Sequence, residues 1–363
     1  MRRVAIASAA TTKFTKISEK PIFELACDPC VEIVRDFGKG IEAVMLSTCA
    51  TDQYSSAIVS EMLGLKPKVS QRIDNLCNSG TNAIASAYSM IAVGLCDSAL
   101  VIGAEKATSE GNRLTWDVTR GALNFPVHWA AMFAKAHMRR YGTTEEQMAG
   151  VSVKNHRNAA NNPKALFQRP VSIKDVMGSK KIADPIKLLD CSAPCDGASA
   201  VFLLGEEKAK KMENPVWING IGQQTNGASF ANTTADLTKL DTARRAANEA
   251  YKMAGIKPSQ VDIAELHDAF TILEIIAYED LGFSKKGEGG RFVSQQKDIA
   301  INTRGGILGC GHPVGATGVS QTAEIALQLA GRAGKRQVKD CRTGLVHNLA
   351  AAGSSATVMV LGV

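Results

Sequence analysis

The sequence lacks the features that would mark a membrane protein or a disulfide-stabilised one. Its 363 residues contain no run of about 18 or more uncharged apolar residues, so no membrane span is expected. Nine cysteines cannot form a dense framework in a chain of this length, and several stand inside apolar segments. We therefore predict free thiols and a cytoplasmic location. The basic, then apolar N-terminus is short and continues into "TTKFTK", which favours a first core strand over a secretion signal.

Signatures of nucleotide and nucleic-acid binding are also absent from the sequence. It contains no phosphate loop, dinucleotide fingerprint, helix-turn-helix, zinc finger or RNA-binding motif. The net charge of +7 is unevenly placed: residues 106–189 hold 14 Lys and Arg against 6 Asp and Glu, and the remainder sums to −1. This basic segment indicates either an anionic partner at that surface or chance clustering on a solvated face. A nucleic acid is the less favoured partner.

The order of apolar and amphipathic segments is repeated in the two halves of the chain. An apolar strand opens each half, at residues 3–12 and 216–225, and helical patterns then alternate with apolar strands. A helix rich in small residues follows at 79–94 and at 315–331, and two apolar strands close each half. The order β-α-β-α-β-α-β-β occurs twice if a third strand is placed before each small-residue helix. This alternation predicts an α/β fold in which helices cover mixed sheets.

An inserted segment interrupts the first copy between its last two strands. Residues 106–189 have the pattern of helices and polar loops, and they carry the basic excess. We predict an N-terminal half of residues 1–105 and 190–212, an inserted loop domain of residues 106–189, and a C-terminal half of residues 213–363. Because ligand contacts are usually built on loops that a rigid scaffold holds, the insertion is expected to contact the ligand.

Cys77 and His312 stand at equivalent places in the two copies, just before the small-residue helices. A duplicated fold brings equivalent helix starts together near its pseudo-twofold axis. The positive end of a helix dipole and its unpaired N–H groups favour a thiolate at Cys77, and a nearby histidine can take the thiol proton. A buried packing thiol is the alternative for any single cysteine. The glycines around both residues favour a Cys-His nucleophile, because they let backbone and substrate approach closely.

Two further histidines stand at strand ends. His267 and Asp268 follow one apolar strand, and His347 and Asn348 stand late in another. Ligands gather at the carboxyl ends of strands in parallel-type sheets. A structural histidine is the alternative for either pair alone, but together with Cys77 both pairs are interpreted as part of one site.

The remaining cysteines and histidines have a structural interpretation. The pairs in "CDPC" (Cys27, Cys30) and "CSAPC" (Cys191, Cys195) could be read as four zinc ligands. One pair lies in an apolar helical pattern and the other beside a strand, without zinc-ribbon turns, so no metal site is expected there. Three histidines stand in the insertion, and we expect them at the surface or beside the substrate. They are His128, His137 and His156.

Four motifs together identify the family that the sequence resembles. They are "CNS" at 77–79, "HDAF" at 267–270, "GHPVGATG" at 311–318 and "HN" at 347–348. In this combination they resemble the thiolase superfamily nearly end to end, and most closely its sterol-carrier-protein-type branch with archaeal and bacterial relatives. The resemblance implies the thiolase fold, with two duplicated halves, mixed five-stranded sheets in an αβαβα layering, and an inserted loop domain.

The resemblance also implies acyl transfer on coenzyme A thioesters, with a role for each motif. Cys77 would attack the carbonyl and carry the acyl group, and His312 would activate Cys77. His267 and His312 would hold the thioester oxygen, since fixed donors aimed at an enolate oxygen supply several kcal/mol. The backbone N–H of Cys77 and one from the loop after His347 would hold the oxyanion of the acylated enzyme, with Asn348 and Gly311 as the oxyanion and loop residues. The insertion would face the phosphates of coenzyme A, which is substrate and product and not a bound cofactor.

The sequence departs from other thiolases at the proton-transfer step. Many members carry a second catalytic cysteine near the C-terminus, where this chain has His347, and the sterol-carrier branch can place a cysteine in "HDCF", where this chain has Ala269. His347 is the first choice for the acid and base. Cys310, two residues before His312, is the second choice, with a packing thiol as its alternative. Alanines in the "HNLAAAG" loop stand where relatives tend to have glycines, which is expected to reshape the acyl pocket.

These observations predict a thiolase that works by ping-pong acyl transfer through Cys77. One substrate hypothesis is condensation of two acetyl-CoA to acetoacetyl-CoA, and the other is thiolytic cleavage of a bulkier 3-oxoacyl-CoA, such as an aromatic one. The altered loop favours the second. The resemblance further implies a homodimer and a small zinc-containing acyl-CoA-binding partner. A retro-aldol lyase on the same fold and a non-catalytic thiolase-like subunit are the alternatives. Cys77 within "CNS" counts against the lyase, and the retained Cys77, His267, His312 and His347 count against the non-catalytic subunit.

Overall fold

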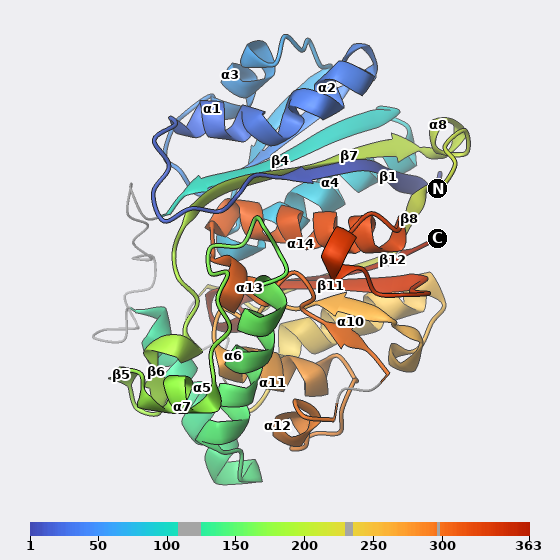
Figure 1. The fold of residues 1–363 in the computed structure, drawn as a ribbon. Helices are drawn as coiled ribbons and strands as arrows, with labels where there is room; N and C mark the ends of the chain where they lie inside the picture. The colour runs from blue at the N-terminus through green and yellow to red at the C-terminus, as the bar shows by residue number, and fades with distance from the viewer. Residues whose placement is uncertain (108–124, 229–234, 296–297) are drawn as a thin grey trace.

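Five strands and their covering helices form the first half of the protein (Figure 1). The computed structural model describes residues 1–107, 125–228, 235–295 and 298–363. The elements of the first half are β1 (Val4–Thr11), α1 (Ile22–Cys27), α2 (Val31–Phe37), β2 (Ala43–Ser47), α3 (Ser55–Met62), β3 (Val69–Ile73), α4 (Ser79–Val93), β4 (Ser98–Lys106), β7 (Asp196–Gly205) and α8 (Glu206–Ala209).

The second half repeats this order, and the insertion adds helices and a hairpin between β4 and β7. The elements of the second half are β8 (Val216–Thr225), α10 (Asp241–Ala254), β9 (Ile263–Glu265), α11 (Thr271–Asp280), α12 (Gly289–Phe292), β10 (Ala300–Ile301), α13 (Gly306–Cys310), α14 (Val314–Leu329), β11 (Thr343–Ala350) and β12 (Ser355–Gly362). Those of the insertion are α5 (Pro126–Tyr141), α6 (Glu145–Ala159), α7 (Ile173–Gly178), β5 (Lys181–Ala183) and β6 (Ile186–Lys187). Among the helices of the described ranges, none combines the length and the apolar character that crossing a bilayer requires.

The two halves have the same strand order and are joined edge to edge. The large sheet is ordered β10-β9-β11-β12-β8-β1-β7-β4-β2-β3. If the five strands of each half are numbered along the chain, both halves have the order 3-2-4-5-1 from the outer edge to the junction. The three strands farthest from the junction are parallel in each half. At the junction β1 pairs antiparallel with β8, through Ala5 with Trp217 and Ile6 with Val216. The predicted duplication of mixed sheets is confirmed.

Helices form three layers around the two halves of the sheet (Figure 1). Helices α1, α2 and α3 cover the outer face of the first half, α4 and α14 lie between the halves, and α10 and α11 cover the outer face of the second. This is the αβαβα layering that the thiolase resemblance implies. Strands β7 and β12 are buried along their whole length, which explains why their sequences are almost continuously apolar.

Two glycines allow the central helices to approach closely near their N-terminal ends. A Cβ atom on Gly80 of α4 would lie 2.7 Å from the backbone nitrogen of Val319, and one on Gly318 of α14 would lie 2.7 Å from the backbone nitrogen of Thr81. Only glycine fits at such a backbone approach. The crossing therefore fixes the distance between the residues that precede the two helices.

The insertion packs on the second half through an apolar cluster. Trp129 and Phe133 of α5 and Val151 of α6 contact the cluster that contains Leu273 and Ile276 of α11. Since α11 begins shortly after the "HDAF" motif, this packing holds the insertion close to the end of β9. The predicted domain boundaries themselves stay a prediction.

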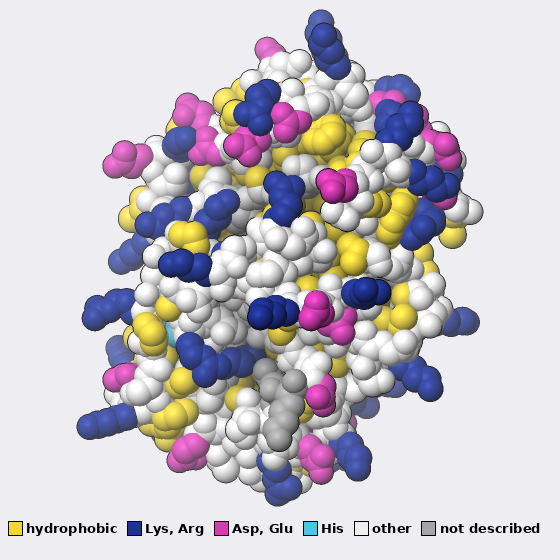
Figure 2. Space-filling model, turned by 45° about the vertical axis from the view of Figure 1, so that its right-hand side comes forward, with side chains coloured by type: hydrophobic (Ala, Val, Ile, Leu, Met, Phe, Trp, Pro, Cys, Tyr) yellow, Lys and Arg dark blue, Asp and Glu magenta, His cyan; other side chains and the backbone are white. Residues whose placement is uncertain are grey.

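Part of the basic excess of the insertion is internal. Lys154 is buried and pairs with Glu274, and Lys187 is buried and pairs with Glu145 at 2.9 Å. These two cations are not available to an anionic ligand at the surface. The basic residues within 108–124 lie outside the described residues. On the face shown in Figure 2, Lys and Arg side chains are spread among acidic and polar ones.

The structure places two of the three insertion histidines in the core instead of at the surface. His137 Nδ1 lies 2.7 Å from Thr143 Oγ1, and its Nε2 lies 3.1 Å from the Glu279 carboxylate. His156 Nδ1 lies 2.9 Å from the Ser152 carbonyl oxygen, and burial lowers the pKa of His156. The expectation of surface histidines is wrong here because their partners come from tertiary packing that the insertion sequence does not display.

Candidate active site

Cys77 lies in a strained turn between β3 and α4. The turn is a 3₁₀ turn, Leu76–Asn78, and Leu76 has a φ of 50°. This left-handed conformation costs an L-residue about 1–2 kcal/mol. The backbone N–H of Asn75 donates to Ser79 Oγ at 2.6 Å, and Ser79 Oγ donates to the Leu76 carbonyl at 2.6 Å. These bonds hold the turn that presents Cys77 just ahead of the helix.

His312 reaches the same point from the second half. It follows Gly311, which has a φ of 92°, and its backbone N–H donates to the Ala193 carbonyl at 2.9 Å. His312 Nδ1 lies 2.8 Å from Thr317 Oγ1, and Thr317 Oγ1 donates to the Pro313 carbonyl at 3.2 Å. Because the Thr317 hydroxyl gives its proton to Pro313, it accepts from Nδ1–H of His312. The Nε2 atom of His312 is therefore unprotonated.

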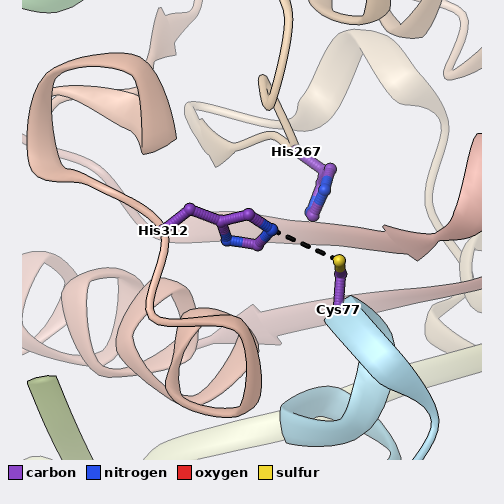
Figure 3. Close-up of side chains that lie close together, drawn as sticks. All are labelled: Cys77, His267 and His312. Carbon is purple, nitrogen blue, oxygen red and sulfur yellow. Dashed lines mark hydrogen bonds between the residues drawn. The ribbon is translucent and has the colours of Figure 1, made fainter. Parts of the chain in front are cut away.

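Cys77 and His312 are in direct contact (Figure 3). The Nε2 atom of His312 lies 3.3 Å from Cys77 Sγ and accepts the thiol proton. His267 points toward the same place, and the sulfur and one ring nitrogen of each histidine lie within 4.8 Å of one another. The rings of His267 and His312 meet edge to face, with centroids 5.4 Å apart and planes at 82°. The structure thus brings together three of the residues selected from the sequence.

Burial keeps the resting pair of Cys77 and His312 neutral. It raises the pKa of Cys77 to about 12, and the Glu105 carboxylate adds to the rise. Burial and the nearby Arg304 cation lower the pKa of His312 to about 4. Burial and the neighbouring histidines lower the pKa of His267 well below its ordinary value. The thiolate expected from the helix terminus does not form at rest, because the loss of water opposes the charge. The thiol ionises only as its proton moves to His312.

Asp268, next to His267, has a structural role. Its Oδ1 accepts from the backbone N–H of Ile307 at 2.6 Å, and its Oδ2 accepts from that of Leu308 at 3.2 Å. Asn155 Nδ2 of the insertion donates to the same Oδ2 at 2.6 Å. Asp268 therefore ties the loop of His267 to α13 and α6, and it holds the histidine in place without facing Cys77 itself.

His347 lies on the other face of β11 from Asn348. Asn348 faces α14, where it contacts Gln321. Leu345 and Leu349, which share the opposite face with His347, belong to the apolar clusters on the side of α10 and α11. In the described part of the chain, His347 contacts the group of three only through the backbone N–H of His267. The acid–base role that the sequence assigned first to His347 stays a prediction.

Replacing His347 with asparagine is expected to reduce the pH dependence of stability. His347 Nδ1 accepts from the backbone N–H of His267 at 3.5 Å, and asparagine keeps an acceptor there. Burial lowers the pKa of His347 to about 3 from its ordinary 6.5. Between these values the unfolded chain binds a proton that the folded chain does not, so stability falls as the pH falls. From about pH 7.5 to about pH 5 this residue accounts for a loss of about 2 kcal/mol.

Urea unfolding of the wild type and His347→Asn at the two pH values measures this difference. The variant is expected to lose about 2 kcal/mol less than the wild type over the interval. Equal losses in the two proteins would show that His347 is not held neutral in the folded state.

Cys310 has the contacts of a packing thiol. Its Sγ donates to the Arg304 carbonyl at 2.9 Å and accepts from Asn162 Nδ2 at 3.5 Å. It shares an apolar cluster with Phe14 and Cys195, and burial raises the pKa of Cys310 to about 12. Because the Cys310 proton is given to a carbonyl, the alternative that the sequence left open, a structural thiol, fits its surroundings better than an acid–base role.

The loop after Asn348 has a left-handed backbone. Ala351, Ala352 and Gly353 have φ values of 45°, 61° and 82°. Two alanines in this region together cost about 2 kcal/mol relative to an ordinary conformation. The loop is held by Thr242 Oγ1, which donates to the Gly353 carbonyl at 2.7 Å, and by apolar packing of Ala352. An oxyanion donor in this loop stays a prediction.

The cysteine pairs considered as zinc ligands lie in different parts of the core. Cys30 packs with the outer helices of the first half, and Cys195 packs elsewhere with Phe14. All nine cysteines are free thiols. In the described ranges, the one group of three or more potential metal ligands in suitable geometry is the active-site group itself. It consists of Cys77, His267 and His312.

Sequence reasoning missed the residues that orient the two histidines. Thr317 stands five residues after His312 in the same "GHPVGATG" motif, and that proximity is a signal the sequence does offer. Gln321 has no local signal, because its partner Asn348 comes from a distant strand. Asn348 Nδ2 lies 2.8 Å from Gln321 Oε1 and 3.1 Å from His267 Nδ1.

The matches to family models cover almost the whole chain. The model "Thiolase, N-terminal domain" matches residues 4–207, and "Thiolase C-terminal domain-like" matches residues 222–363. The chain therefore belongs to the thiolase family of acyltransferases.

Individual relatives cover most or all of the chain as well. The sequence is 36% identical to "Acetyl-CoA acetyltransferase" of Methanothermobacter thermautotrophicus over 99% of both chains. It is 36% identical to "Benzoylsuccinyl-CoA thiolase subunit BbsB" of Thauera aromatica over 76% of this chain and 74% of the relative. The solved structure of the "Ltp2-ChsH2(DUF35) aldolase" has a TM-score of 0.89 at 27% identity, over 99% of this chain and 97% of that one.

Proposed function

We propose that this protein is a thiolase that transfers acyl groups through a thioester on Cys77. The proposal rests on the 3.3 Å contact between Cys77 Sγ and His312 Nε2 at the N-terminal ends of α4 and α14. The unprotonated nitrogen faces the thiol, as a general base requires. The similarity to an archaeal acetyl-CoA acetyltransferase over the whole chain supports the same chemistry.

In the first half-reaction, Cys77 Sγ attacks the ketone carbon of a 3-oxoacyl-CoA while His312 Nε2 takes the thiol proton. The bond between this carbon and the α-carbon breaks, the acyl group stays on Cys77, and the electron pair leaves as the enolate of acetyl-CoA. His312 gives the proton to the α-carbon, and His267 donates a hydrogen bond to the enolate oxygen. Because the leaving carbon needs the proton that the thiol loses, this step balances without a second catalytic cysteine.

In the second half-reaction, a free coenzyme A thiol attacks the acyl carbonyl on Cys77. Its proton passes to His312 and then to the Cys77 sulfur as the new acyl-CoA leaves, which restores the neutral pair. The reverse sequence condenses two thioesters. The sequence had assigned the proton transfer to His347 or Cys310. We assign it to His312, because this is the ring nitrogen within hydrogen-bonding distance of Cys77 Sγ.

Acyl loading of the protein by different thioesters tests the proposal. The purified protein is incubated with acetyl-CoA and, separately, with larger 3-oxoacyl-CoA esters, aromatic ones included, and its intact mass is measured. We expect an acyl adduct that maps to Cys77 and forms faster from a bulky ester, since the loop of alanines differs from the usual glycines. An adduct that forms from acetyl-CoA but from none of the larger esters would indicate the condensation of two acetyl-CoA to acetoacetyl-CoA. No adduct from any ester on a folded protein would overturn the proposal.

A retro-aldol lyase is the second candidate function. The similarity of the aldolase structure over nearly the whole chain favours it. Aldol cleavage needs no acyl-cysteine, so the fate of activity without Cys77 separates the two reactions.

We also propose that the protein forms a homodimer and binds a small zinc-containing acyl-CoA-binding subunit. Strand β3 is a half-exposed edge strand of the large sheet, and such an edge can pair with another chain. One relative is named as a thiolase subunit, and the aldolase structure contains a second named component. Light scattering tests the dimer, and a particle mass equal to that of one chain, 38.5 kDa, would contradict it.

A further inference from the structure

A series of buried amide hydrogen bonds leads from strand β11 to His267. Gln321 Nε2 donates to the His347 carbonyl at 3.4 Å. Asn348 Nδ2 lies 2.8 Å from Gln321 Oε1 and 3.1 Å from His267 Nδ1. Gln321 and Asn348 are both 0% exposed, and His267 is 2% exposed. With so little access to water, the orientation of each amide is decided by its neighbours.

The carbonyl of His347 fixes the direction of the whole series. A carbonyl only accepts, so Gln321 turns its Nε2 toward it and its Oε1 toward Asn348. The Oε1 atom also only accepts, so Asn348 presents its Nδ2 there, and the same NH₂ group donates its other proton to His267 Nδ1. His267 Nδ1 is therefore unprotonated, and the neutral ring carries its proton on Nε2.

We propose that Gln321 and Asn348 are positioning residues that hold His267 as its Nε2–H tautomer. In that form His267 donates a hydrogen bond to the oxygen of the bound thioester and of its enolate. The tautomer follows from the contacts alone, and only the identity of the accepting oxygen rests on the proposed function. The Nε2 atom of His267 makes no hydrogen bond within the described part of the chain, so it is free to meet a ligand.

The two active-site histidines are thus held in opposite tautomers. Thr317 accepts from His312 Nδ1–H, and His312 presents a lone pair to Cys77. Asn348 donates to His267 Nδ1, and His267 presents an N–H. A base and a hydrogen-bond donor therefore stand side by side in one site. The same Nε2 proton opposes metal binding, since a ligating histidine needs an unprotonated nitrogen facing the metal and a hydrogen-bond acceptor behind the ring.

The variant Asn348→Asp reverses the polarity at His267 and tests the proposal. A carboxylate accepts from Nδ1–H, so the proton should leave Nε2. We expect kcat to fall about 100-fold with KM changed less than about threefold, the effect of losing one oxyanion donor. Alkylation of Cys77 by iodoacetamide, which depends on His312, should keep its wild-type rate. Inhibition by zinc chloride should become at least about tenfold stronger, because a carboxylate now supports the metal-binding tautomer.

Nitrogen-15 NMR of histidine-labelled protein reads the tautomer directly and needs no turnover. The His267 signals are assigned by their loss in His267→Asn. We expect a protonated Nε2 in the wild type, a protonated Nδ1 in Asn348→Asp, and a mixture in Gln321→Met, where the amide of Asn348 can flip. A protonated Nδ1 in the wild type would overturn the proposal even if a variant fails to fold.

Thr322→Val is the matched control for these variants. Thr322 follows Gln321 on α14, is equally buried, and donates from Oγ1 to the Gly318 carbonyl at 2.9 Å. We expect it to leave the tautomer, kcat and zinc sensitivity unchanged. An equal loss of kcat in Thr322→Val and Asn348→Asp would show a general packing effect and contradict positioning. An absent acyl adduct with the expected tautomer would overturn the proposed function but not the tautomer.

Discussion

Replacing Cys77 with alanine is expected to lower the rate of acyl transfer by at least about 10⁴-fold while the fold stays intact. The Cys77 sulfur is the nucleophile that His312 Nε2 contacts at 3.3 Å, and neither neighbouring histidine can form the same thioester. The loss of 3-oxoacyl-CoA absorbance in the presence of free coenzyme A measures the rate. Circular dichroism and the melting temperature report the fold.

The matched control is Cys27→Ala. Cys27 is a half-buried free thiol on α1, in the outer helical layer of the first half. We expect this variant to keep wild-type activity. If Cys77→Ala still cleaved a 3-hydroxyacyl-CoA, releasing a carbonyl compound and acetyl-CoA, the protein would be a lyase and not a thiolase.

Replacing Gly80 with alanine is expected to remove about 3 kcal/mol from the free energy of unfolding. The new Cβ would lie 2.7 Å from the backbone nitrogen of Val319 and 3.0 Å from Gly318 Cα, and backbone atoms cannot rotate out of the way. The two central helices must move apart, and each carries one member of the Cys77–His312 pair at its start. We therefore also expect acyl loading of Cys77 to slow by about 100-fold, since a misplacement of about 1 Å is enough for that.

Gly178→Ala is the matched control for Gly80→Ala, the substitution at the contact between the two central helices. Gly178 ends α7, and a Cβ there would meet no atom within 4 Å. Urea unfolding and stopped-flow acyl loading of both variants give the two numbers. A Gly80→Ala protein as stable and as fast as Gly178→Ala would mean that the helices can separate without loss, and that their contact does not set the geometry of the site.

The sequence was enough to predict the layers and the meeting of the helix starts. Stretches such as residues 99–104 and 200–205 are apolar along their length because both faces are covered, and that pattern is visible without a structure. The small residues before and within 79–94 and 315–331 mark the helices that must cross closely. Once the two copies are aligned, the pairing of Cys77 with His312 follows from the symmetry of the duplication.

Other features could not be predicted because they depend on contacts between distant residues. His137 is buried because Glu279, 142 positions away, meets its ring. The protonation of Cys77 depends on how much water the folded chain excludes, which an argument from one helix terminus leaves out. The tautomer of His267 depends on the direction of two amide groups, and a sequence gives their positions but not their orientation.

The pairing of β8 with both β1 and β12 has a consequence for how the chain can be connected. Trp217 of β8 pairs with Ala5 on one side and Gly362 on the other. Two strand spacings place Ala5 and Gly362 about 10 Å apart, and the two ends of the chain lie on the same side of the molecule (Figure 1). Gly205, where β7 ends, pairs with Val4 at this same edge. A circular permutant, with the present ends linked and new ends opened between β7 and β8, would keep every strand pairing. Nucleophile and base would still meet, because the joined sheet brings them together whichever half is synthesised first.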